Sequence, residues 1–139
     1  DAPQDVPPNE VVILQPYGSL FFAAAPVFEE ALPHPIAESV NSVVILRLRG
    51  RTDLASSFME VLGRYVEELA SVGSKLVLIS GDETIHQQLA ETRVTAAVGT
   101  ENIYTSDEWI GATLKIAHDD ATAWIAGNEP DDSDNQTDP

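Results

Sequence analysis

The chain has 139 residues, no cysteine, and 7 Lys and Arg against 23 Asp and Glu, which gives a formal net charge of −16. The length suits one domain with its own core, and the missing cysteines exclude disulfides and cysteine–metal sites. The acidity argues against nucleic acid as a partner, because phosphate binding requires clustered cations. Three scattered histidines, His34, His86 and His118, show no metal-ligand spacing, so we expect neither a metal nor a cofactor.

The two ends of the chain differ in composition from its middle. Residues 1–9, "DAPQDVPPN", hold three prolines and two acids and are predicted to form an extended linker. Residues 128–139, "NEPDDSDNQTDP", hold five acids and no apolar side chain, so we expect a disordered acidic tail. The folded domain is therefore expected over residues 10–127.

The first elements in chain order are two short strand-like runs. "VVILQP" (residues 11–16) is followed by "LFFA" (residues 20–23) across a turn at Gly18, which predicts an antiparallel hairpin. A short helix is expected from Pro26, which suits a first helical turn, to Pro33. "SVVILRLRG" (residues 42–50) begins as a continuous apolar run, typical of a strand that is buried on both faces.

The longest predicted helix begins at Asp53, a suitable N-cap, and ends before Gly73, a suitable C′ residue. Its apolar residues form one stripe at helical spacing: Leu54, Phe58, Val61, Leu62, Tyr65, Leu69 and Val72.

The rest of the chain repeats the strand-then-helix order. A buried strand is expected at "KLVLIS" (residues 75–80), followed by a short helix capped by Asp82. A last short strand at "NIY" (residues 102–104) precedes a helix introduced by "TSDE" (residues 105–108), which has capping-box spacing, and ended by Gly127. Strands separated by helices require crossover connections, so we predict an α/β fold with a mostly parallel sheet, made mixed by the initial hairpin.

No enzyme motif is present. The sequence contains no GxGxxG, no GxxxxGK[ST] and no GxSxG, which argues against a dinucleotide site, a P-loop and a nucleophile elbow. A combination of Ser56 or Ser57 with His86 and an acid can be named, but such combinations arise by chance in most proteins. We therefore expect no enzymatic activity.

The scarce positive charge gathers in one place: Arg47, Arg49 and Arg51 lie within five residues of each other, directly before the long helix. If the strand continues, their i, i+2, i+4 spacing points all three to one side. The carboxyl end of a parallel strand is where open α/β sheets bind ligands, and the N-terminus of a helix favours an anion. The alternative is that these arginines neutralise nearby acids in weak exposed pairs.

Hydroxyl side chains follow the arginines. Thr52, Ser56 and Ser57 surround Asp53, whose charge opposes a strong anion site. A phosphoryl group on Ser56 would lie in the first helical turn, where the helix dipole stabilises it by about 0.3 to 1 kcal/mol. The alternative is that these small residues let the helix approach the strand closely.

Several of these segments together resemble a known family. The four segments are "YGSLFFAAAPVFEEAL" (residues 17–32), "VVILRLRG" (43–50), the long helix with the strand after it (51–80), and "ENIYTSDEWIGATL" (101–114). Their order resembles the STAS domain of sulfate transporters and anti-sigma factor antagonists. Gly18 with "LFFA" is similar to a signature of the cytoplasmic C-terminal domain of SulP-type anion transporters. The resemblance implies an α/β STAS fold: a mixed sheet with an N-terminal antiparallel pair and about four to five helices.

The site residues of the family are matched only in part. The switch loop of the family reads Asp-Ser-Ser/Thr-Gly before the long helix, whereas here Leu54 and Ala55 separate Asp53 from Ser56, and Phe58 stands where glycine is expected. Ser56 and Ser57 are thus candidate phosphosites by approximate equivalence.

The resemblance implies a non-catalytic, cytoplasmic regulatory domain of a SulP-type anion transporter, for sulfate or a bicarbonate-type anion, that is soluble as a fragment. Its implied partners are the membrane domain of its own transporter, a second copy in a homodimer, or a regulatory protein or anionic ligand. The residues Arg47 to Ser57 are the expected contact surface. Two alternatives stay open: a free-standing anti-sigma factor antagonist-like protein switched by serine phosphorylation, and an anion- or nucleotide-sensing domain.

Overall fold

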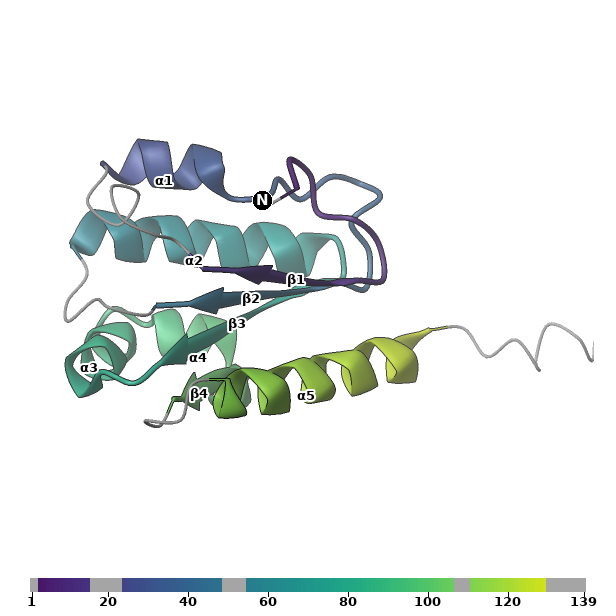
Figure 1. Cartoon of the computed structure of the whole chain (residues 1–139). Helices are drawn as coiled ribbons and strands as arrows, with labels where there is room; N and C mark the ends of the chain where they lie inside the picture. The colour runs from purple at the N-terminus through teal and green to yellow at the C-terminus, as the bar shows by residue number, and fades with distance from the viewer. Residues whose placement is uncertain (1–2, 16–23, 49–54, 107–110, 130–139) are drawn as a thin grey trace, which may run out of the picture.

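The computed structural model describes residues 3–15, 24–48, 55–106 and 111–129 (Figure 1). The elements follow in the order β1 (Val11–Leu14), α1 (Ala25–Ala31), β2 (Val43–Arg47), α2 (Ser56–Ser71), β3 (Lys75–Ser80), α3 (Glu83–Glu91), α4 (Val94–Val98), the 3-10 helix η2 (Thr100–Asn102), β4 (Ile103–Thr105) and α5 (Ala112–Asn128). The predicted alternation of strands and helices is confirmed.

The four strands form one sheet in the order β1-β2-β3-β4, and every neighbouring pair is parallel. Val43 is in register with both Val11 and Lys75. The expected mixed sheet is wrong for the described strands, because helical crossovers join them all in the same direction. The return strand of the expected hairpin, residues 20–23, lies outside the described residues.

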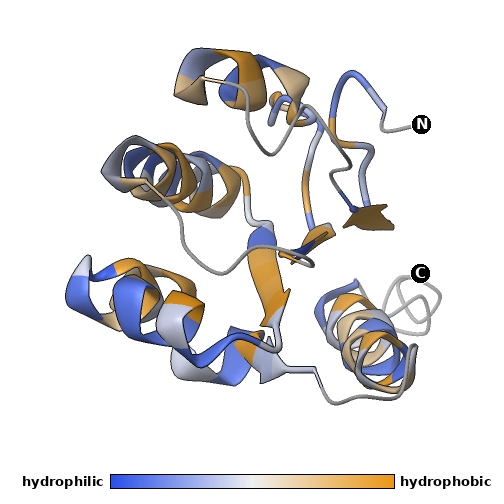
Figure 2. Cartoon of the chain, turned by 60° about the vertical axis from the view of Figure 1, so that its left-hand side comes forward, coloured by the Kyte–Doolittle hydropathy of each residue, from blue (hydrophilic) through white to orange (hydrophobic). Residues whose placement is uncertain are grey.

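The two faces of the sheet bury separate cores. Val44 and Leu46 of β2 belong to the larger core with α1, α2, α3 and α4. Val43 and Ile45 belong to the smaller core, which α5 covers with Ala117, among others. Figure 2 shows this arrangement, with α5 alone on its side of the orange strands. Burial of β2 on both faces, predicted from its continuous apolar run, is confirmed.

The ends of α2 agree only in part with the sequence. The helix begins at Ser56, and its N-cap is Ala55, whose extended backbone carries no side-chain capping bond. The expectation that Asp53 is the N-cap is therefore wrong. At the other end Gly73 has φ +77°, and the amide of Ser74 donates to the carbonyl of Leu69 at 2.9 Å, as in a Schellman motif. The prediction for Gly73 is confirmed.

The second half of the chain contains one confirmed cap and two departures. Asp82 caps α3 by accepting from the amide of Ile85 at 3.1 Å. Helix α4 has no counterpart in the sequence prediction. Helix α5 begins after Gly111, at φ +91°, rather than at the expected capping box, because Thr105 still belongs to β4.

Part of the segment expected to be a linker packs onto the domain. Val6 is 1% exposed and lies in the larger core. Two buried serines hold the same segment: Ser39 Oγ donates to the carbonyl of Val6 at 2.6 Å, and Ser42 Oγ donates to that of Pro7. The folded unit thus includes residues before the expected boundary at residue 10.

Candidate interaction surface

The carboxyl ends of the parallel strands meet at one edge of the sheet, where α2 and α3 begin (Figure 1). The described residues at this edge include Gln15 after β1, Arg47 at the end of β2 and Ser80 at the end of β3. Ligands of open α/β sheets bind at this kind of edge. The predicted segment from Arg47 to Ser57 has both its first and its last residues at this edge, since Arg47 ends β2 and Ser57 lies in the first turn of α2.

Arg47 is the arginine of the cluster that the structure describes. It is half-buried, and its Nη1 donates to Oε1 of Gln15 at 2.6 Å. Because side chains alternate along a strand, Arg47 lies on the same face as Val43 and Ile45, which is the face that α5 covers. Arg49, Arg51, Thr52 and Asp53 lie outside the described residues.

Ser56 and Ser57 are both exposed, and they are the first two residues of α2. Helix α2 packs on the face of the sheet opposite α5. The described residues therefore place Arg47 and the two serines on different faces of the sheet, and no hydrogen bond among them joins the two groups. The serines are accessible to a modifying enzyme or a partner.

Beside them, the end of β3 is fixed by local hydrogen bonds. The amide of Ser106 donates to the carbonyl of Ser80 at 3.2 Å, and Nε2 of His86 lies 2.6 Å from the same oxygen. The side chain of Ser80 is buried and accepts from the amide of Asp82 at 3.2 Å. The ring of His86 is thus held against the backbone through Nε2.

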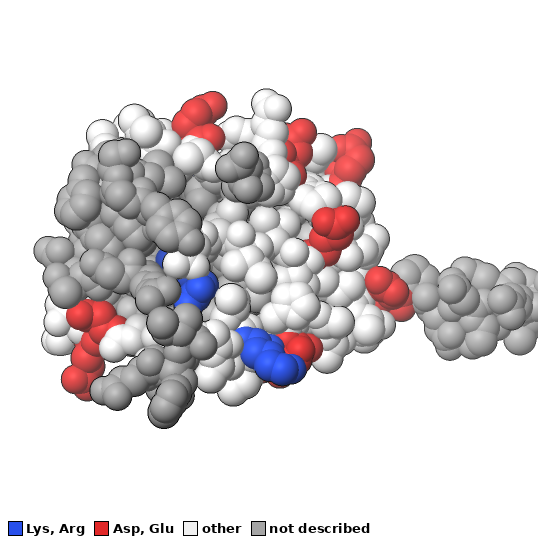
Figure 3. Space-filling model, in the orientation of Figure 1, with Lys and Arg blue, Asp and Glu red and all other residues white. Residues whose placement is uncertain are grey.

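Charge is unevenly distributed over the surface. On the face shown in Figure 3, acidic groups are spread widely, whereas basic groups occupy small areas. Within the described part of the chain, no cluster of three or more His, Asp or Glu side chains could hold a metal ion. The side chains described at the edge, Gln15, Arg47 and Ser80, are all polar or charged.

Sequence reasoning missed polar contacts on the face of the sheet that α5 covers. Nζ of Lys75 donates to Oδ1 of Asn102 at 2.8 Å and lies 4.8 Å from the ring centroid of Trp124. Burial lowers the pKa of Lys75. On β4, the hydroxyl of Tyr104 donates to Asp120 at 2.6 Å, and burial, together with this bond, raises the pKa of Tyr104 to about 12. These contacts attach α5 to the sheet.

The architecture and the comparison with known proteins together identify the family of this chain. A parallel sheet with helices on both faces defines the class, an open α/β domain. Proteins of this class usually bind ligands at the carboxyl ends of the strands. The STAS domain family model matches residues 2–108, so the chain belongs to the STAS domain family. No curated protein matches the chain.

A solved structure shares the fold. It is described as the crystal structure of a sulfate transporter family protein from Wolinella succinogenes, and it is 20% identical to this chain, with a TM-score of 0.62. The match covers 87% of this chain and 91% of the other. Within the ranges that the structure describes, no helix is both long and apolar enough to cross a bilayer.

Proposed function

We propose that this chain is a non-catalytic regulatory and interaction domain of a SulP-type anion transporter, on the cytoplasmic side of the membrane. The observation that carries the proposal is membership of the STAS family together with the shared fold of a sulfate transporter family protein. The motif of Gly18 with residues 20–23 supports the same assignment.

The proposed role is docking, either onto the membrane domain of the same subunit or onto a neighbouring subunit. The segment from Arg47 to Ser57 is the proposed contact surface, because it concentrates cations in an acidic chain. The exposure of Ser56 and Ser57 supports this role. An acidic body repels anionic lipid, so the arginines would also favour the approach of this one edge to a membrane surface.

The test is deletion of the domain from the full-length parent protein. Anion uptake by the deletion variant is measured alongside its abundance in the membrane, with the intact parent as reference. We expect uptake per transporter molecule to change. Unchanged uptake at unchanged abundance would remove the regulatory role.

A second candidate function is a phosphorylation-switched partner of a kinase or anti-sigma factor. It is favoured by the exposed positions of Ser56 and Ser57 in the first turn of α2, where the helix dipole stabilises a phosphoryl group. Incubation with the kinases of the source cell, followed by mass spectrometry, tests it. Phosphate on neither serine would exclude the switch.

A third candidate, an anion or nucleotide sensor, is supported only by the arginine cluster. Calorimetry with sulfate, ATP and GTP would show saturable heat that Arg49→Ala abolishes. Absence of heat with all three anions would remove this candidate.

A further inference from the structure

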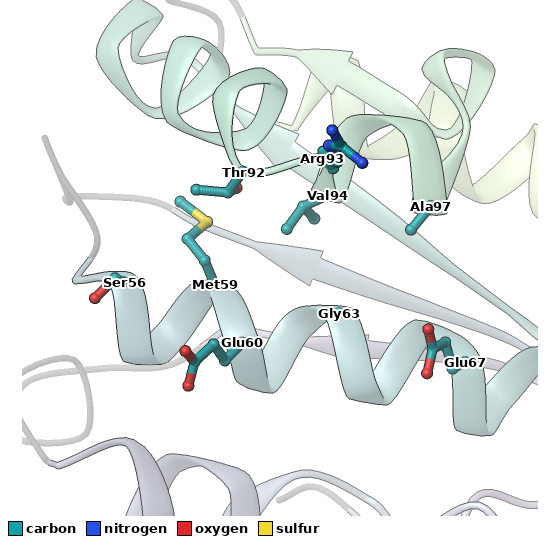
Figure 4. A pocket seen from close by; sticks show the side chains of 9 residues that line it. All are labelled: Ser56, Met59, Glu60, Gly63, Glu67, Thr92, Arg93, Val94 and Ala97. Carbon is teal, nitrogen blue, oxygen red and sulfur yellow. The ribbon is translucent and has the colours of Figure 1, made fainter.

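A groove separates α2 from the segment formed by the α3–α4 turn and α4. It has a volume of about 510 Å³ and lies on the helical side of the larger core (Figure 4). Nine residues line it: Ser56, Met59, Glu60, Gly63, Glu67, Thr92, Arg93, Val94 and Ala97. Five of them lie on α2 and recur at helical spacing, so the groove follows one stripe of that helix for about three turns.

The floor of the groove is apolar. Met59 and Val94 are 4% and 3% exposed. Figure 4 shows Met59 reaching from α2 toward Thr92, with Val94 and Ala97 directed back toward α2. An occupant would therefore contact side chains that already belong to the core.

The middle of the groove is open because α2 carries a glycine there. Gly63 lies inside the helix, where glycine lowers stability relative to alanine. Its backbone has no positive φ, and a Cβ built on it would meet nothing within 4 Å. Neither the helix geometry nor internal packing thus requires glycine, and the missing side chain would let an external backbone approach α2 closely.

The two walls carry opposite charges. Glu60 and Glu67 are exposed on the α2 wall, two turns apart. Arg93 is exposed on the other wall, with a left-handed backbone at φ +66°. Four other described cations have partners, since Arg47 and Lys75 bond to amides and Arg64 and Lys115 pair with acids.

The charged side chains that line the groove, unlike these four cations, have no partner among the described residues. Within the described part of the chain, the side chains of Arg93, Glu60 and Glu67 make no hydrogen bond or ion pair, although the charge of Glu60 helps to raise the pKa of Arg64. An arginine without an acidic partner is unexpected in a chain with 23 acids and 7 Lys and Arg. Because Arg93 and the two carboxylates are unpaired in the described part of the structure, the charged groups on both walls are available to an external molecule.

We propose that this groove binds an amphipathic helix from another polypeptide segment, with small apolar residues facing Gly63, Lys or Arg facing Glu60 and Glu67, and an acid facing Arg93. Its length matches the three turns of α2, and opposite charges on its two walls fix the direction of the bound helix. The site is separate from the proposed Arg47 to Ser57 surface except at Ser56, and it does not depend on the parent being a transporter.

The experiment uses the whole chain and two side-chain-crosslinked peptide helices of about 15 residues, a length that needs the crosslink to stay helical. Both peptides carry an alanine stripe. One places two lysines, seven positions apart, beside this stripe and a glutamate on the opposite flank, and the other has glutamate at all three positions, so that it cannot pair with Glu60 and Glu67 in either direction. Affinities are measured by fluorescence anisotropy at low salt, where charge pairs are strongest.

We expect the lysine peptide to bind at least tenfold more tightly than the glutamate peptide. Gly63→Leu, which fills the groove, should weaken binding at least tenfold. Gly127→Leu is the matched control: Gly127 also lies in a helix with nothing within 4 Å of its Cβ position, but on α5, so this variant should bind like the unmodified chain.

The double variant Glu60→Lys, Glu67→Lys should prefer the glutamate peptide, and both of its positions are exposed, so it should fold even if Gly63→Leu does not. Equal affinity for the two peptides, no binding of either, or an unchanged preference in the double variant would overturn the proposal. Each of these results is independent of anion uptake by the parent, so the two proposals can fail separately.

Discussion

Two glycines show how the same residue type has opposite effects at different backbone positions. Gly73 has φ +77°, a conformation that costs an L-residue about 1 to 2 kcal/mol. Gly63 has helical geometry and open space at its Cβ position. The first glycine stabilises the fold by ending α2, whereas the second destabilises α2 while leaving the groove open.

Alanine substitution should separate these effects. Gly63→Ala is expected to raise the free energy of unfolding by about 0.5 to 1 kcal/mol, because alanine restricts the unfolded chain and favours helix. Gly73→Ala should lower it by about 1 kcal/mol or more, because of the strained backbone. Urea unfolding followed by circular dichroism measures both. A loss of stability in Gly63→Ala would mean that the helix needs glycine at this position.

Residue-scale predictions from the sequence succeeded where the signal is local. Asp82 and Gly73 were identified correctly as caps, because a capping residue acts on amides or carbonyls a few positions away. The prediction that Asp53 caps α2 was wrong, because the capping propensity of a residue does not specify at which residue the helix begins. The sequence did not predict the left-handed backbone conformation of Arg93, because this conformation depends on the packing of the two helices that Arg93 joins.

At the scale of elements, α5 depends on few contacts, because it is alone on its face of the sheet. Its buried residues are Ala117, Ala121 and Ile125, two of which are small. Polar contacts at its flank supplement this apolar contact, including the bond from Tyr104 on β4 to Asp120. The attachment of α5 should therefore respond to the protonation of Tyr104.

The titration of Tyr104 predicts a loss of stability at alkaline pH. Its pKa is about 12 in the folded chain against 10.0 for the ordinary side chain, so between these values the unfolded chain binds fewer protons. Stability should thus fall as pH rises from about 10 to 12. Tyr65, whose pKa burial also raises, acts in the same direction, whereas the lowered pKa of Lys75 acts in the opposite one.

Comparison with Tyr104→Phe at each pH isolates this contribution. At pH 8 the variant should be slightly less stable, because it lacks the bond to Asp120. The difference should shrink as pH rises above 10, since only the unmodified chain loses the proton. Urea unfolding at pH 8, 9, 10 and 11 measures the trend. A difference that is constant with pH would show that the Tyr104 phenol titrates normally.

The sequence predicted most elements because each carries a strong hydrophobic pattern. Continuous apolar runs identify β2 and β3, and the stripe from Phe58 to Leu69 identifies α2. The parallel pairing of β1 with β2 depends on tertiary packing, so a turn signal at Gly18 could not predict it. Helix α4 was missed because five residues are too few to show a period.

At the scale of the whole molecule, the candidate site was harder to predict than the fold. The sequence placed the Arg47 to Ser57 segment between a strand and a helix, which is correct. It did not show that Arg47 lies on the α5 face while Ser56 begins a helix on the other, because hydrophobic periodicity does not specify which face of a sheet a helix covers. The groove was equally hidden, since its walls come from helices that are distant in the sequence.

The start of the chain shows a related limit. Prolines and acids predict an extended linker over residues 1–9, and composition cannot reveal that one valine among them reaches the core. Val6 is 1% exposed, and the buried serines Ser39 and Ser42 donate to carbonyls of this segment. Ser74, also buried, accepts from the amide of Ser42 at 2.8 Å, so the network continues to the start of β3.

Removal of residues 1–9 should therefore destabilise the domain. Full burial of a valine contributes about 1.5 to 3 kcal/mol, and loss of the carbonyl acceptors leaves two buried hydroxyls to find other partners. We expect the free energy of unfolding to fall by about 2 kcal/mol or more. Val6→Ala alone should lower the free energy of unfolding by less, and the difference between the two variants measures the contribution of the hydrogen bonds and the rest of the segment.

Removal of residues 130–139 is the matched control, because it shortens the chain by a similar length at the acidic end. It removes four acids and no apolar side chain, so stability should stay within about 0.5 kcal/mol of the intact chain, as for changes outside a core. Chemical denaturation of the three chains at the same ionic strength measures the comparison. If removal of residues 1–9 proved as harmless as removal of the tail, the segment around Val6 would not contribute to the stability of the core.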